Sequence, residues 1–253
     1  MKRKAESFQE AESSIKLEVS LPSGRCATVS VLESGTVADL KIAAQRSLEQ
    51  RFLRLATADG RLLDPTDSLH LSGLRDGDSI AAVAQQPKLA ARMHAFALWC
   101  IGGRIVTWGH PDCGGVPHRF GNIKDQLNNV QQVCGTKFAF AAVLSDGSVV
   151  TWGDLDCGGD SSKVQDQLKN VRQISGAFGA FAAILADGSV VTWGDPDRGG
   201  VSSRVQDQLK NVQQICGTNF AFAAILADGS IVTWGDPDHG GDSSRVQDEF
   251  NYL

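Results

Sequence analysis

The sequence predicts a mainly β protein in which a small α+β domain precedes a partial or small β-propeller of about four repeats. Three runs are almost identical, at residues 141–159, 182–200 and 223–241, and a looser copy occupies 97–115. Alternating apolar residues flank an Asp-Gly pair in each close copy, which is typical of a β-hairpin with a two-residue turn. The tryptophans near the ends of these hairpins are 44, 41 and 41 residues apart, a period typical of a four-stranded propeller blade.

The number of repeats raises the question of how the array closes. Hairpins are expected to begin near residues 95, 139, 180 and 221, and the chain ends about half a repeat after the last Trp-Gly pair. An open array would leave unpaired sheet edges, which proteins normally pair or cap. Three alternatives stay open: an unusual closure, a homodimer in which two chains complete one propeller, or a shortened member of a longer family.

The N-terminal third has a different pattern. Residues 1–14 are polar and are predicted to be a disordered tail. Residues 15–32 alternate around a Pro-Ser-Gly turn and predict a hairpin. A capping-box-like start at Thr36 and apolar spacings of 3, 4 and 4 predict a helix that ends near Gln50. A strand and turn follow in 51–64, and a short turn and a closing strand follow in 68–85.

This order of strand, strand, helix, strand, short strand and strand resembles the ubiquitin-like β-grasp fold over residues 15–85. The resemblance is carried by the LPSG turn, by TVADLK at the helix start, by ADGRLLD, and by LRDGDSI before the last strand. The last strand continues into AQQPKLAARMH without a terminal Gly-Gly pair, so the resemblance implies a built-in domain and not a conjugated modifier. Residues 86–94 are then expected to be a linker.

The resemblance also implies a recognition patch on this domain. The position of ubiquitin's central isoleucine corresponds to about Ala56, and an apolar neighbour is retained at Val83. Alanine offers less apolar area than isoleucine, so ubiquitin receptors are expected to bind weakly or not at all. The residues implied for this patch are Leu21, Ala56 and Val83.

The repeats resemble those of the regulator of chromosome condensation family, over about residues 91–253. The matching features are the strand ending in Trp-Gly, a Gly-rich turn, a V-x-x-x-L-x-x-V-x-x-I segment, a Cys-Gly pair and the Asp-Gly hairpin. The resemblance implies a propeller array over 95–253, although seven blades are usual in that family. It also places a turn at VQDQLKN and a strand at VQQIC, whereas the spacing of 4, 3 and 3 in this segment alone indicates an amphipathic helix. We expect the turn and the strand.

The charge and composition of the chain indicate which kinds of partner it can bind. The net charge is −5, and residues 1–90 contain 12 basic and 12 acidic residues, so the acidic excess lies entirely in the repeats. An acidic array is a poor match for phosphate backbones, and nucleic acid is not expected as a partner. No apolar run is long enough to span a membrane and no secretory signal is visible, so we expect an intracellular protein, cytoplasmic or nuclear. The six cysteines are expected to be reduced thiols.

Candidate binding residues lie in the loops that follow each Trp-Gly pair, at 154–163, 195–204 and 236–245. These loops recur at one edge of the array and differ in charge between copies, as a recognition surface can. Their carboxylates also suit calcium, but no bidentate Glu follows at the spacing of a calcium loop, and Asp, Pro and Gly are ordinary turn residues. The candidates are Asp154, Asp156, Asp195, Asp197, Arg198, Asp236, Asp238 and His239.

These patterns favour a non-enzymatic scaffold or adaptor that links a client held by the repeats to the ubiquitin system. No nucleophile, phosphate-loop or metal-ligand motif is present, so no catalytic residue, cofactor or metal is expected. The expected partners are proteins: an unknown client, and ubiquitin receptors or ligase components. The alternative is a fragment or accessory subunit of an E3 ubiquitin ligase of the HECT type, since large ligases of that type carry similar repeats.

Overall fold

The computed structural model describes residues 13–101, 103–116 and 123–249. The predicted tail, residues 1–14, lies almost wholly outside these ranges. Internal contacts divide the chain into two units, Met1–Gln86 and Pro87–Leu253. In the described ranges, no helix has both the length and the apolar character that crossing a membrane requires.

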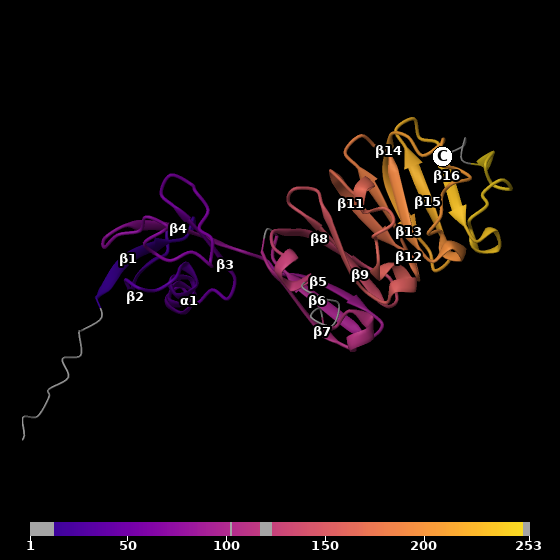
Figure 1. Ribbon diagram of the computed structural model, residues 1–253. Coiled ribbons are helices and arrows are strands. Elements are labelled where there is room, and N and C mark those ends of the chain that lie inside the picture. The colour runs from indigo at the N-terminus through magenta and orange to yellow at the C-terminus, as the bar shows by residue number, and fades with distance from the viewer. Residues whose placement is uncertain (1–12, 102, 117–122, 250–253) are drawn as a thin grey trace, which may run out of the picture. The chain divides into compact units, whose positions relative to one another are not determined.

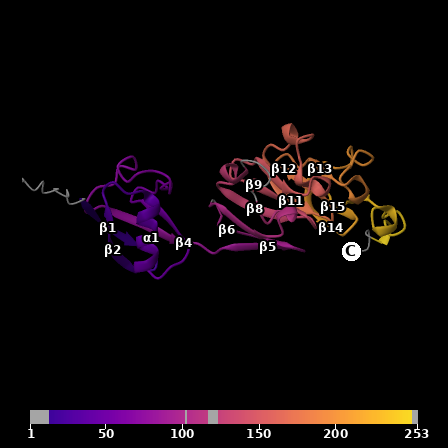
Figure 2. The ribbon, with the colours of Figure 1, turned by 60° about the horizontal axis from the view of Figure 1, so that its bottom comes forward.

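The first unit is a four-stranded mixed sheet with one helix (Figure 1). Its strands are β1 (Ser14–Ser20), β2 (Cys26–Leu32), β3 (Leu53–Thr57) and β4 (Ser79–Ala84), and its helix is α1 (Val37–Ser47). The sheet order is β2-β1-β4-β3, with β1 and β4 parallel and the outer pairs antiparallel. This topology is that of a β-grasp domain. The helix α1 lies beside this sheet (Figure 2). Alternate residues of the strands and the apolar stripe of α1 form one core.

Local chemistry explains where the helix begins and ends. Thr36 and Asp39 form a reciprocal capping box, which fixes the start as predicted. The helix ends at Ser47 and not near Gln50, because Glu49 adopts a left-handed conformation with φ of 51°. The predicted short strand before the closing strand is also absent: residues 58–78 form turns, with isolated bridges from Leu62 to Ala56 and from Ser68 to Thr36.

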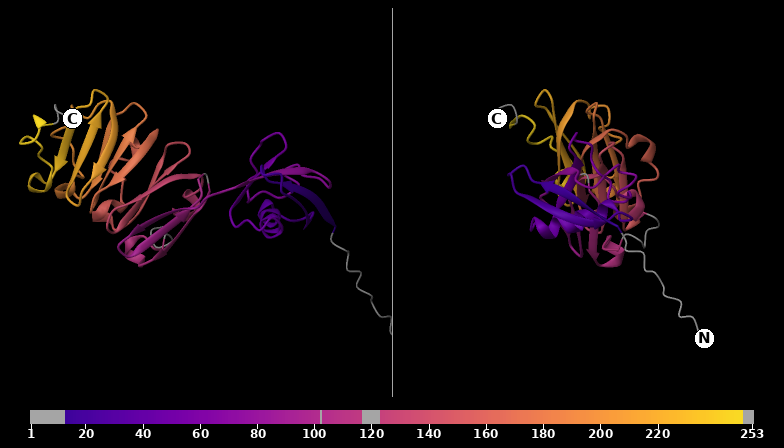
Figure 3. Two further views of the ribbon diagram at one scale, coloured as in Figure 1. Left: turned by 180° about the vertical axis from the view of Figure 1, so that it is seen from behind. Right: turned by 90° about the vertical axis from the view of Figure 1, so that its left-hand side faces the viewer.

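The second unit consists of four antiparallel sheets, which we call blades one to four in chain order (Figure 3). Blade one contains β5 (Lys88–Arg92), β6 (Ala95–Trp99) and β7 (Ile105–Gly109). Blade two contains β8 (Val130–Gly135), β9 (Ala139–Leu144) and β10 (Val149–Gly153). Blade three contains β11 (Val171–Gly176), β12 (Ala180–Leu185) and β13 (Val190–Gly194). Blade four contains β14 (Val212–Gly217), β15 (Ala221–Leu226) and β16 (Ile231–Gly235).

Short helical segments follow the third strands of the blades. They are η1 (Pro111–Cys113), α2 (Ile123–Gln126), η3 (Leu155–Gly159), η4 (Gln165–Gln167), η5 (Pro196–Arg198) and η6 (Pro237–His239). The first strands of consecutive blades, β5, β8, β11 and β14, contact one another. The unit is therefore mainly β, with the sheets succeeding one another as the blades of a propeller do.

The array confirms the predicted hairpins and corrects two details. The strands β6, β9, β12 and β15 begin at residues 95, 139, 180 and 221, and VQQIC lies in β14 after a turn at 205–211. Each sheet has three strands in the described residues, not the four that the period indicated, because the remaining length of the repeat forms short helical turns. The prediction of a linker at residues 86–94 is also wrong, because this segment contains β5, which pairs with β6.

The Asp-Gly turns differ from the predicted two-residue type. Only the glycine is left-handed, with φ of 79° at Gly147, and its N–H donates to Leu144 O at 3.0 Å. Ser145 and Asp146 thus occupy the centre of the turn and Gly147 follows it, which is the three-residue loop with a glycine bulge. Asp146 accepts hydrogen bonds from the hydroxyl and N–H of Ser148, and these hold the pKa of Asp146 below its usual value.

The core of the array lies between blades, because each blade has two different apolar faces. Each later blade turns a phenylalanine and a tryptophan toward the blade before it; we call this its aromatic face. The opposite face, its alanine face, carries two alanines and β-branched residues. Between blades three and four, Ala180, Ala182, Ile184 and Val190 pack against Phe222, Ala224, Val232 and Trp234. The same pairing of faces recurs between blades two and three.

A hydrogen bond fixes the position of each aromatic face. The Nε1 groups of Trp152, Trp193 and Trp234 donate to carbonyl oxygens in the loop after the preceding blade, at 3.0, 3.0 and 3.1 Å. The acceptors are Gly114, Gly158 and Gly199. The repeated Trp-Gly motif therefore joins neighbouring blades, and the indole N–H stays satisfied although the ring is buried.

Candidate functional site

A row of aromatic side chains crosses all four blades at the turns between their first and second strands. We call His94, Phe138, Phe178 and Phe220 the aromatic rim. The ring centroids of successive members are 6.2, 6.4 and 6.3 Å apart, and the first and last of these pairs are stacked. His94 is exposed and the three phenylalanines are half-buried. The rim is therefore a continuous aromatic surface that solvent reaches along its length.

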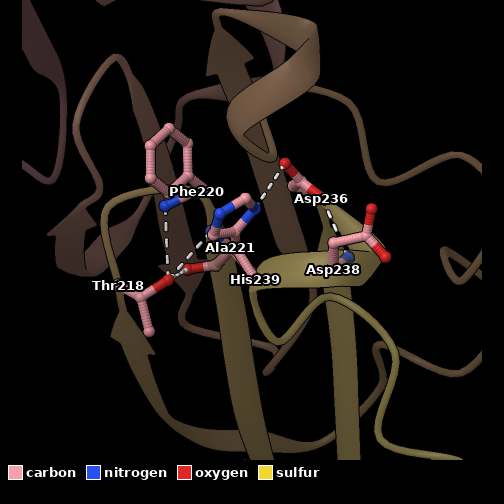
Figure 4. Close-up of polar contacts among 6 residues, drawn as sticks. All are labelled: Thr218, Phe220, Ala221, Asp236, Asp238 and His239. Atoms are coloured by element: carbon pink, nitrogen blue, oxygen red, sulfur yellow. Dashed lines mark hydrogen bonds and ion pairs between the residues drawn. The ribbon is translucent and has the colours of Figure 1, made fainter.

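Backbone hydrogen bonds place the loop after each Trp-Gly pair beside this rim. His110 N donates to His94 O at 2.7 Å, and Asp236 N donates to Phe220 O at 3.0 Å. The turn below Phe220 is fixed by the Thr218 hydroxyl, which accepts from the N–H groups of Phe220 and Ala221 (Figure 4). These contacts explain why loops that are distant in sequence from the rim contribute side chains to it.

Two cations lie over the rim. Lys137 Nζ is 4.5 and 4.4 Å from the ring centroids of Phe138 and Phe178. The Arg198 guanidinium carbon is 4.1 and 5.1 Å from those of Phe178 and Phe220. Gly179 leaves room for this arginine, since a β-carbon there would lie 3.2 Å from Arg198 Cδ. Each cation thus bridges two rings, an arrangement that stabilises both through cation–π attraction.

The two ends of the rim carry histidines. The His239 ring lies 4.5 Å from that of Phe220 and places Nδ1 2.8 Å from Asp236 Oδ2 (Figure 4). This hydrogen bond holds the pKa of Asp236 below its usual value. At the other end, the rings of His94 and His110 are 6.3 Å apart. The rings of the rim therefore lie beside the cations Lys137 and Arg198, and beside the carboxylates of Asp195 and Asp236 at the end formed by blades three and four.

The structure brings some of the predicted loop residues to the rim and uses others for local structure. Arg198 and His239 contact rim rings, and they pair with Asp195 and Asp236. Asp154, Asp195 and Asp236 also cap the turns that follow them by accepting backbone N–H groups. Asp156, Asp197 and Asp238 are exposed beside these caps.

The calcium alternative gains no support from this geometry. In the ranges the structure describes, no group of three or more His, Cys, Asp or Glu side chains is placed to hold a metal ion. One oxygen of each capping carboxylate already accepts an N–H group. Asp154, Asp195 and Asp236 therefore act as turn caps, and the last two also pair with Arg198 and His239.

Cys157, in the loop beside Thr136, illustrates how the array suppresses thiol chemistry. Burial, with a smaller contribution from the Asp154 carboxylate, raises the pKa of Cys157 to about 11. Burial likewise raises the pKa of Cys113. The six cysteines, all within the described residues, form no disulfide, and Cys26 and Cys216 are exposed. Since the thiolate is the nucleophile, the two exposed thiols are the accessible ones for electrophiles.

We therefore expect iodoacetamide at neutral pH to modify Cys26 and Cys216 first. Cys157 should react far more slowly in the folded protein, because it is half-buried and a pKa of about 11 leaves on the order of one thiolate in ten thousand at pH 7. Peptide mass spectrometry over a time course would measure the order. Modification of Cys157 as fast as Cys216 would contradict the burial described here.

The patch implied for the first unit is assembled only in part. Leu21 belongs to the core of this unit and is not available to a partner. Ala56 and Val83 lie on the face of the sheet away from α1, where they pair with Ala81 and Arg54. Ala56 is buried, whereas Val83 is 47% exposed. The apolar surface on this face is thus centred on Val83.

The rim phenylalanines and Lys137 were not predicted from the sequence. Phe178 stands one position earlier in its repeat than Phe138 and Phe220, so no single repeat position identifies the row. One feature of the sequence could have indicated the rim: a single repeat position is occupied by Lys137, Phe178 and Asn219 in turns that are otherwise similar. Variation at a fixed position of near-identical repeats is what a recognition surface shows.

Comparisons with known proteins show similarity to solved structures alone, since no family model and no curated protein matches the chain. Human WBSCR16 is 19% identical over 62% of this chain and 49% of its own, with a TM-score of 0.44. Yeast RCC1 (Prp20), in its structure with Kap60, is 18% identical over 58% and 43%, with a TM-score of 0.45. The ubiquitin of Caldiarchaeum subterraneum is 20% identical over 29% and 96%, with a TM-score of 0.27.

The chain spans about half the length of the first two of these structures, 49% and 43%. The strand pairing of this chain itself defines its fold: a four-stranded mixed sheet with a helix, followed by four successive antiparallel blades.

Proposed function

We propose that this protein is a non-enzymatic interaction scaffold whose aromatic rim binds a protein client. The observation that carries the proposal is the run of rings bridged by Lys137 and Arg198. Aromatic residues and arginine are enriched at protein interfaces, and arginine is also enriched among the few residues that dominate the binding energy there. The rings are already ordered by stacking, so a client need not immobilise them on binding.

The chemistry of the rim favours a protein client over nucleic acid. The rim carries carboxylates beside its cations, and Arg198 Nε is already paired with Asp195 at 2.7 Å. Phosphate backbones require an excess of cations, whereas the repeats are acidic overall. A polypeptide with apolar side chains and both signs of charge fits this mixture of groups.

We further propose that the first unit links the client to the ubiquitin system. Support comes from its β-grasp topology and from the exposed face around Val83. That face offers little apolar area, because Ala56 is buried and its neighbour is another alanine. The interaction is therefore expected to be weak unless a client brings the two partners together.

The test compares the full-length chain with three variants in affinity purification followed by mass spectrometry. Arg198→Ala removes the cation over Phe178 and Phe220, and should weaken client binding about tenfold or more. Val83→Asp should lose ubiquitin-system partners and keep the client. Arg204→Ala is the matched control, because Arg204 is an exposed arginine of the same array that takes no part in the rim.

The two halves of the proposal can fail separately. If Arg198→Ala recovers the same client proteins as the unaltered chain, the rim does not bind the client. If the unaltered chain recovers no ubiquitin-system proteins, the adaptor role is wrong and the scaffold role is unaffected.

A further inference from the structure

The two ends of the array expose opposite halves of the contact that joins its blades. Blade one has no blade before it, and its aromatic face is open: Phe96 is 39% and Trp108 is 44% exposed. The corresponding Phe181 and Trp193 in blade three are 0% and 4% exposed. Val106 and Leu89 of the same blade are exposed as well.

This open aromatic face already has the geometry of the buried ones. The rings of Phe96 and Trp108 are stacked with centroids 5.2 Å apart. The buried pairs of blades two to four have centroids 5.5, 5.2 and 5.3 Å apart and are likewise stacked. The first blade therefore presents a preformed copy of the surface that each later blade buries.

Blade four exposes the other half of the contact. Ile225 on its alanine face is 41% exposed, whereas Ile184 at the same position of blade three is 1% exposed. A β-carbon at Gly114, Gly158 or Gly199 would lie 2.6–2.8 Å from a phenylalanine ring of the next blade. At Gly240, the same position after blade four, nothing lies within 4 Å. Blade four therefore has the surface that an aromatic face contacts in the other blades, and no aromatic face covers it in the single chain.

We propose that a second copy of this chain docks head to tail, with the aromatic face of its blade one on the alanine face of blade four. In this contact Trp108 Nε1 donates to the Gly240 carbonyl of the other copy, and Phe96 covers that glycine. The chain already makes such a contact three times, between each pair of neighbouring blades. The contact between two copies would have the same residue types at most positions. That self-complementarity selects a second copy as the occupant.

Two copies can form a closed ring, because each copy supplies one open aromatic face and one open alanine face. Two chains of four blades then form a ring of eight, within the range of blade numbers that propellers adopt. A head-to-tail contact that closes gives a ring, whereas one that does not close gives a filament. The closed pair hides both apolar faces, and it uses the ends of the array, so it does not depend on the proposed client site.

The test measures the mass of the full-length chain by sedimentation over a concentration series. The expected mass is twice 26.9 kDa. Trp108→Asp and Ile225→Asp are each expected to give the single-chain mass, with association weakened by about 30-fold or more. Both side chains are exposed in one chain, so circular dichroism should show an unchanged fold. Val201→Asp, at an exposed apolar residue away from both faces, is the control and should keep the double mass.

Mixing the two variants separates head-to-tail docking from other arrangements. An equimolar mixture of Trp108→Asp and Ile225→Asp chains retains one intact contact and should form mixed pairs. A pair built from two aromatic faces would be lost with Trp108→Asp and kept with Ile225→Asp, which would overturn the proposal. A single-chain mass at every concentration, or a ladder of growing masses, would also overturn it.

Discussion

Replacing Trp193 with alanine is expected to lower the free energy of unfolding by about 3–5 kcal/mol. Trp193 is 4% exposed, packs against the alanine face of blade two, and donates its Nε1 hydrogen bond to Gly158 O. The substitution removes that bond and opens a cavity between two blades. Urea unfolding followed by circular dichroism would measure the loss.

Trp108 is the matched control for this experiment, because it holds the same repeat position in blade one. Its ring is 44% exposed in one chain, so Trp108→Ala is expected to cost about 1 kcal/mol or less. The comparison is made at a protein concentration low enough to keep the chain single, since association would bury Trp108 and raise its contribution. Equal losses for the two tryptophans would show that burial between blades does not stabilise the array as we infer.

The repeat pattern predicted the array because its signals are local. The Asp-Gly pairs and the alternation around them fix where β9, β12 and β15 begin, and both act within a few residues. The β-grasp order was predicted for the same reason, through the capping box at Thr36. The period alone could not tell a fourth strand from a helical turn of similar length.

The linker error and the missed rim have a different origin. Lys88–Arg92 carries few strand signals of its own, and it becomes β5 by pairing with β6, which a sequence window does not reveal. The rim depends on which turns lie side by side in neighbouring blades, as with Lys137 and Phe178, which are 41 residues apart. Arg198 was predicted from its variable loop, but its position over Phe178 and Phe220 depends on turns of two neighbouring blades, which the sequence does not place side by side.

Replacing Gly199 with alanine is expected to destabilise the array by about 2–5 kcal/mol. Two effects add. The residue has φ of 87°, a conformation that costs an alanine about 1–2 kcal/mol. A β-carbon would also lie 2.6 Å from Phe222 Cδ2, in a ring that is fully buried between two blades.

Gly240→Ala separates these two effects, because Gly240 has φ of 99° and nothing within 4 Å of its would-be β-carbon. At a protein concentration low enough to keep the chain single, this control should show only the conformational cost, about 1–2 kcal/mol. The difference between the two variants in urea unfolding then measures how rigidly the phenylalanine of one blade is seated on the loop of the blade before it. If the two losses are equal, neighbouring blades yield to the extra methyl, and the contact between them is too loose to define the position of the rim. If Gly199→Ala costs more, as we expect, the blade contact is rigid enough to hold the rings and cations of the rim in one register.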